Sequence, residues 1–88
     1  MPTQSEVTIG IILRPHGLRG LVKVRPLTDD ANRYFALKKV RLHLKGALLG
    51  EFALEHVTMS TPKNLLLKFR GRDSINEVEA LRGVEIRI

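Results

Sequence analysis

The chain has 88 residues, which is enough for one compact domain and too few for two. It contains no cysteine, so disulfides and thiolate metal ligands are excluded and a reducing, cytoplasmic compartment is expected. No apolar run approaches the roughly 18 residues that span a bilayer, so we expect no membrane insertion. Residues 1–6 lack the basic and apolar segments of a signal peptide and are expected to form a disordered tail.

The net charge of +6 lies entirely in the first half of the chain. Residues 1–45 contain nine Lys or Arg against three acidic residues, whereas residues 46–88 contain six of each. A positive field on one side favours encounter with an acidic partner such as nucleic acid or a ribonucleoprotein surface. The alternative is that these side chains only keep a small domain soluble.

The order of apolar and charged residues predicts six short strands. Residues 7–13 are apolar and β-branched, and residues 21–26 alternate between apolar side chains and the cations Lys23 and Arg25. Further strands are predicted at 40–44, 52–57, 65–69 and 84–88, and Gly46 and Gly50 are expected to bracket a turn.

One clear helix is predicted near the C-terminus. Ser74 and Glu77 have capping-box spacing, and Gly83 stands where a glycine commonly ends a helix. Thr28 and Asp29 are expected to fix the turn that follows the second strand. Six short strands and one late helix predict an all-β fold, a small antiparallel barrel, with an open sandwich as the alternative.

The sequence offers no constellation for catalysis or metal binding. The only histidines are His16, His43 and His56, which are scattered, and His43 and His56 are expected to be surface side chains. A nucleophile would need a base and a group that orients this base, and no such set is present. We therefore expect no enzymatic activity and no cofactor.

Nucleic-acid binding receives more support from the charges than from the aromatic residues. A basic stripe could be formed by Arg14, Arg19, Lys23, Arg25 and Arg33. Recognition of single strands normally needs exposed aromatic rings on which bases stack. Of the four aromatic residues, Tyr34 is expected to be exposed, and Phe35, Phe52 and Phe69 are expected in the core.

The segment 14–20 is the most unusual local feature of the chain. Its proline and two glycines predict a loop with specific turn geometry. Leu18 beside Arg19 at its tip is typical of an interface, although a plain turn would explain the glycines equally well. The predicted partner-binding residues are Arg14, Pro15, His16, Gly17, Leu18, Arg19, Gly20, Lys23 and Arg25.

Several short motifs resemble the N-terminal domain of the RimM family of bacterial ribosome-maturation factors. The likeness extends over residues 7–88, and its order and spacing match the family pattern. The motifs are Gly10-Ile11-Ile12, Pro15-His16-Gly17-Leu18-Arg19-Gly20, Val22-Lys23-Val24, Leu27-Thr28-Asp29, and Ala80-Leu81-Arg82-Gly83.

The resemblance implies a six-stranded, translation-factor-like β-barrel and a role in maturing the 30S subunit head and processing 16S rRNA. The implied partner is small-subunit ribosomal protein nineteen on an immature 30S subunit, bound by a monomer. A second, PRC-type barrel found in the family is absent from this chain, and which barrel makes the main contact stays open. The alternative function is direct rRNA binding through phosphate contacts.

Overall fold

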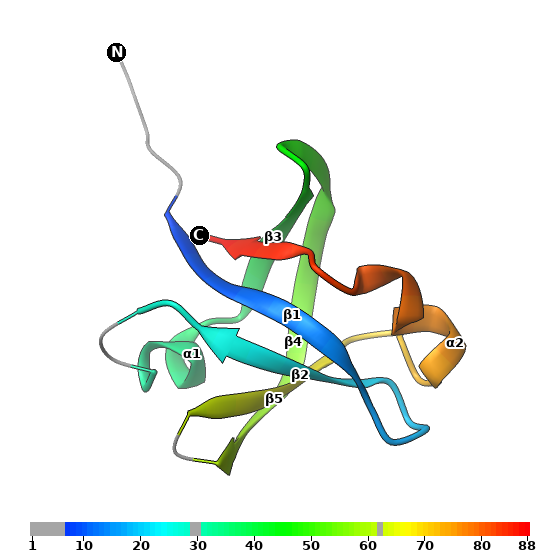
Figure 1. Ribbon diagram of the computed structural model, residues 1–88. Helices are drawn as coiled ribbons and strands as arrows, with labels where there is room; N and C mark the ends of the chain where they lie inside the picture. Colours follow the sequence, from blue (N-terminus) through cyan, green and yellow to red (C-terminus); the bar gives the residue numbers. More distant parts are fainter. Residues whose placement is uncertain (1–6, 29–30, 62) are drawn as a thin grey trace.

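Six antiparallel strands close into a barrel in the computed structural model, in the order β1-β2-β5-β4-β3-β6 (Figure 1). The strands are β1 (Thr8–His16), β2 (Leu21–Pro26), β3 (Lys39–Leu44), β4 (Ala47–Thr61), β5 (Asn64–Phe69) and β6 (Glu85–Arg87). The structure describes residues 7–28, 31–61 and 63–88. The predicted barrel is therefore confirmed, while the predicted tail at 1–6 and the turn residue Asp29 lie outside the described residues.

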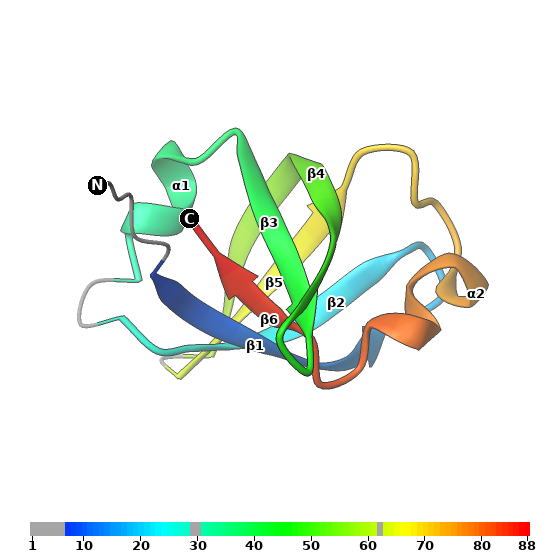
Figure 2. The same ribbon diagram turned by 90° about the horizontal axis from the view of Figure 1, so that it is seen from above.

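Two short helices flank the barrel at opposite ends (Figure 2). Helix α1 (Arg33–Ala36) connects β2 to β3, and α2 (Ile75–Val78) runs into the 3₁₀ turn η1 (Glu79–Leu81) before β6. The Glu77 carboxylate accepts the Asp73 backbone N–H at 3.2 Å and the Ser74 hydroxyl at 3.1 Å. These bonds hold the start of the helix, but they are not the capping box that the spacing of Ser74 and Glu77 predicts, because the N-cap Ser74 makes no side-chain cap hydrogen bond. The helix expected near the C-terminus is thus confirmed.

Alternate residues of neighbouring strands fill the barrel. Val22 and Val24 of β2 face Leu67 and Leu65 of β5 across the ladder, and all four side chains are fully buried. Full burial of such a side chain contributes about 1.5–3 kcal/mol. The period-two pattern in the sequence therefore identifies the interior of these strands correctly.

Strand β4 is longer than the sequence predicts. The turn before it consists of Lys45 and Gly46, which both have positive φ, and Gly50 lies inside β4 opposite Leu42. The expectation that Gly50 closes this turn is wrong. Instead, the register shift beside that pair leaves Leu49 as an extra residue, which is the geometry of a β-bulge.

The two neighbouring aromatic residues of α1 have the reverse of their predicted environments. Tyr34 is fully buried, and its hydroxyl donates a hydrogen bond to the Ile9 carbonyl. Phe35 is 50% exposed. A buried tyrosine is favourable when its hydroxyl finds an acceptor, and Gly10 leaves room for it, because a Cβ there would overlap the Tyr34 hydroxyl.

His43 is also buried, contrary to expectation, with 5% of its surface exposed. Its strand, β3, lies between β4 and β6, so His43 has Leu48 on one side and Glu85 on the other. The pKa of Glu85 is lowered, chiefly by a hydrogen bond from Arg87 and to a smaller extent by the charge of His43. A central strand buries side chains that simple alternation assigns to solvent.

Strand β6 closes the barrel between β1 and β3. Ile86 is opposite Gly10 on one side and Leu42 on the other. Two backbone hydrogen bonds of 3.0 Å join Val7 and Ile88, one in each direction. Ring closure of this kind leaves no long unpaired strand edge along the sheet.

Candidate functional site

The predicted partner-binding residues gather on the β1–β2 hairpin. Strand β1 continues to His16, so the predicted loop at 14–20 is in fact the end of a strand followed by a tight turn at 17–20. We call residues 17–20 the hairpin tip. The cationic face is the outer surface of the two strands, defined by Arg14, Lys23 and Arg25.

A β-bulge places Arg14 on the cationic face. Ile12 is opposite Val24 and Arg14 is opposite Lys23, so Leu13 is an extra residue in β1. Strict alternation from buried Ile12 would turn Arg14 inward, whereas the bulge leaves both Leu13 and Arg14 exposed. Leu13 was not among the predicted binding residues, although the apolar run before Arg14 already breaks a period of two.

The cationic face brings like charges together. Arg14 and Lys23 are direct cross-strand neighbours, and Arg25 follows two residues further along the same side of β2. Within the described part of the chain, none of the three forms an ion pair. Like charges directly opposite one another destabilise a sheet, so carboxylates or phosphates of a partner would relieve this repulsion.

Lys68 of β5 borders the cationic face but carries its own counter-charges. Its ammonium lies 2.7 Å from an Asp73 carboxylate oxygen and 3.7 Å from one of Glu55. The hydrogen bond to Asp73 is the main reason why the pKa of Lys68 is raised, with Glu55 adding to the effect. Lys68 is therefore neutralised within the fold, unlike the three cations of the face.

The hairpin tip presents Leu18 and Arg19 to solvent while its backbone is fixed. Leu18 is 75% exposed, and its carbonyl accepts the N–H of Ile75 at the start of α2 at 3.0 Å. Gly17 and Gly20 have φ of 73° and 89°, which side chains other than glycine rarely adopt. An apolar side chain is thus held outward on a rigid support.

The remaining predicted residues differ in how they are exposed and in what they contact. Pro15 and Gly20 are buried, and a Cβ on Gly20 would overlap the Arg72 carbonyl, so both shape the hairpin. His16 is exposed at the end of β1. Thr28 is half-buried in a bend after β2, and Arg33 lies on α1, outside the cationic face.

Other chemistries have little to build on in the described ranges. Across 7–28, 31–61 and 63–88, no three His, Cys, Asp or Glu side chains come close enough together to hold a metal ion. None of the helices in these ranges is long and apolar enough to cross a membrane.

Comparison with known families identifies the relatives of this barrel. The model of the RimM N-terminal domain matches residues 7–88. The chain belongs to this family. Among curated RimM proteins, each named ribosome maturation factor, that of Frankia casuarinae is 40% identical and that of Aquifex aeolicus 39%. The matches cover 96% and 94% of this chain, but 45% and 49% of those relatives.

A solved structure shows the same RimM barrel. The RimM protein of Pseudomonas aeruginosa, named for 16S ribosomal RNA processing, superimposes with a TM-score of 0.86 at 30% sequence identity. This likeness covers 96% of the present chain and 50% of that protein. The chain thus spans about half the length of the RimM proteins that it matches.

Proposed function

We propose that this domain acts in ribosome maturation as a binding module without catalytic activity. The supporting observation is the cationic face, where Arg14 and Lys23 stand side by side with Arg25 and have no acidic partner among the described residues. Such a face fits an acidic partner. The relatives of this domain are named as ribosome maturation factors, and a solved one is named for 16S rRNA processing. These names favour an acidic partner on the ribosome.

The partner that we propose is small-subunit ribosomal protein nineteen on the immature 30S head. Leu18 supplies an apolar anchor, since an exposed leucine on a fixed backbone loses little backbone entropy on binding. Arg19 forms a charge-assisted hydrogen bond with a carboxylate or phosphate. In this proposal the domain works as a cytoplasmic monomer beside a PRC-type second barrel.

A capture experiment tests the proposal. The 88-residue domain is immobilised and offered purified small-subunit protein nineteen or naked 16S rRNA, at low and at high salt. We expect capture of the protein that survives high salt, because apolar burial is screened less than phosphate contacts. Capture of neither component would contradict a direct role of this domain in binding.

Matched variants locate the contact on the hairpin tip. Leu18→Ala with Arg19→Ala is expected to weaken capture about tenfold or more, as loss of an anchor commonly does. The control is Leu48→Ala with Arg70→Ala, which removes one exposed leucine and one exposed arginine elsewhere. Equal capture by both double variants would refute the assignment to the hairpin tip.

Direct rRNA binding is a second candidate, favoured by the cationic face, whose three side chains form no ion pair with the described residues. It predicts affinity for naked rRNA that falls steeply with salt, with a slope of about −0.7 per phosphate contact on a single strand. Lys23→Gln should then reduce that slope by about one contact. Capture of rRNA alone, lost at high salt, would replace the protein partner with this function.

A further inference from the structure

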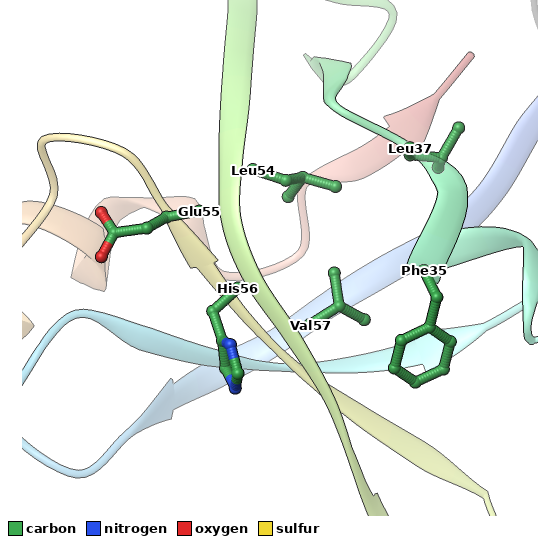
Figure 3. A pocket seen from close by; sticks show the side chains of 6 residues that line it. All are labelled: Phe35, Leu37, Leu54, Glu55, His56 and Val57. Atoms are coloured by element: carbon green, nitrogen blue, oxygen red, sulfur yellow. The ribbon is translucent and has the colours of Figure 1, made fainter.

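A second surface lies at the end of the barrel opposite the hairpin tip. It is a shallow hollow between α1 and β4 (Figure 3), lined by apolar side chains from both elements. The apolar side chains are Phe35, Leu37, Leu54 and Val57, and Glu55 and His56 complete the lining. We call the four apolar residues the α1 hollow.

The two faces of β4 separate apolar from polar groups at the α1 hollow. Figure 3 shows Leu54 and Val57 directed toward the α1 side, whereas Glu55 and His56 lie on the other side of the strand. A register shift against β5 between Leu54 and His56 makes this possible, because it lets residues three apart share one face. The β4 side chains that face α1 are therefore apolar, whereas Glu55 and His56 line the hollow from the other side of the strand.

Phe35 leaves the α1 hollow open. Its neighbour Tyr34 occupies the barrel interior, and the Phe35 ring remains 50% exposed beside Leu37 and Val57. A large aromatic ring next to aliphatic side chains gains free energy when a further apolar group covers it. The hollow is thus suited to receive one apolar side chain.

Two exposed cations, Arg33 and Lys38, neighbour the residues of the α1 hollow along the chain. Arg33 stands one helical turn before Leu37, and the Lys38 carbonyl accepts the Leu54 N–H at 2.8 Å. Within the described residues, neither cation forms an ion pair. The acidic residues of β4 are engaged, Glu51 with Lys39 at 3.3 Å and Glu55 with Lys68 at 3.7 Å.

We propose that the α1 hollow binds an apolar side chain within an acidic segment of a partner protein. Arg33 and Lys38 attract the carboxylates, and the four apolar side chains bury the central residue. A nucleobase fits less well, because among the six described lining residues Glu55 and His56 alone carry a side-chain donor or acceptor for its polar edges. This surface is separate from the one in the proposed function, and either can fail alone.

Short peptides of defined chemistry test the proposal. Three acidic peptides, identical except for a central Leu, Phe or Ala, are titrated to millimolar concentration into the ¹⁵N-labelled protein. We expect the Leu and Phe peptides to shift amide resonances of α1 and of β4 around Leu54 and Val57. The Ala peptide should bind about tenfold more weakly, because it lacks the side chain that fills the hollow.

Two pairs of variants locate the contact. Phe35→Ser should weaken binding of the Leu peptide about tenfold, whereas Leu48→Ser, at a similarly exposed site elsewhere, should not. Lys38→Glu should weaken the peptide more than Arg82→Glu, which makes the same charge change at the other end of the barrel. Dispersed amide spectra establish that each variant is folded.

Three results would overturn the proposal. One is no shift with any peptide at millimolar concentration, and another is equal affinity for the Leu, Phe and Ala peptides. The third is tighter binding of a single-stranded RNA oligomer to the same resonances, which would assign the hollow to nucleic acid. Leu18→Ala should leave the peptide affinity unchanged, so failure here is distinguishable from failure of the hairpin-tip proposal.

Discussion

At each end of the barrel, a glycine leaves room for a closely approaching group, but the group differs between the two ends. At the α1 end, the absence of a side chain on Gly10 admits the hydroxyl of Tyr34. At the α2 end, the absence of one on Gly20 admits the backbone carbonyl of Arg72. One glycine therefore accommodates the end of a side chain and the other a main-chain carbonyl.

Each end also exposes a large apolar residue beside its fixed contact. Leu18 projects from the hairpin tip, and Phe35 projects next to buried Tyr34. In both places the backbone that carries the exposed side chain is anchored, at Leu18 by the hydrogen bond from Ile75 and at Phe35 by the burial of Tyr34. At both ends an exposed apolar side chain therefore lies on an anchored backbone. This arrangement favours binding, because little backbone entropy is lost when a partner docks.

The largest effect should come from the residue that fills the α1 end. Tyr34→Ala is expected to lower the free energy of unfolding by about 3–5 kcal/mol, because it empties a fully buried site. Phe35→Ala should cost about 1 kcal/mol or less, since half of its ring is already in water. Urea unfolding followed by circular dichroism compares the two, and equal losses would contradict the difference in burial.

The next effect should come from the α2 end. Gly20→Ala combines positive φ with overlap against a carbonyl, so we expect a loss of about 3 kcal/mol. Gly17→Ala has similar φ but nothing within 4 Å of a new Cβ, so about 1 kcal/mol is expected. Similar unfolding midpoints for the two variants would show that the Arg72 contact does not restrict this turn.

A double-mutant cycle sharpens the contrast between the glycines. Gly10→Ala should cost about 1–3 kcal/mol, mostly through overlap with the Tyr34 hydroxyl. Tyr34→Phe removes that hydroxyl at a cost of about 1 kcal/mol, since the Ile9 carbonyl keeps the Leu27 N–H at 2.8 Å. The combined variant should be about 1 kcal/mol more stable than additivity predicts. Strict additivity would mean that the hydroxyl is not the obstacle.

The smallest effect should appear at alkaline pH. Burial raises the pKa of Tyr34 well above its ordinary value of 10.0, with the charge of Arg33 opposing the shift. The folded state therefore holds this proton more tightly than the unfolded state. Its contribution to stability is full below pH 10 and is lost as the pH rises further. Unfolding free energies from about pH 9 to pH 11 should converge for wild type and Tyr34→Phe, because the variant lacks this loss while Lys68 is common to both.

The strands and their interior faces could be predicted from the sequence because the barrel follows a period of two. Leu65, Leu67 and Phe69 alternate in the chain and are all buried. The prediction failed where one residue is inserted into a strand. Extra residues at Leu13 and Leu49 change which side chains face outward, and their positions depend on the partner strand as well as on the local sequence.

The exchanged environments of Tyr34 and Phe35 show a second limit. Local polarity favours tyrosine at the surface, and only the distant Ile9 carbonyl and Gly10 make its burial favourable. His43 is similar, because strands far along the chain cover it on both sides. For the candidate site, the sequence alone predicted a set of residues that lie together on the β1–β2 hairpin, whereas the α1 hollow depends on contacts between α1 and β4.

The hydrogen bonds between Val7 and Ile88 have a consequence for biosynthesis. Strand β1 is made first and β6 last, yet β1 and β3 both need β6 as a neighbour. Until residues 85–88 have left the ribosomal tunnel, these two strands retain unpaired edges, and the ring cannot close. Pairing across nearly the whole chain is also intrinsically slow to form. Folding of this domain is therefore expected to finish after its synthesis, in one late step that joins its first strand to its last.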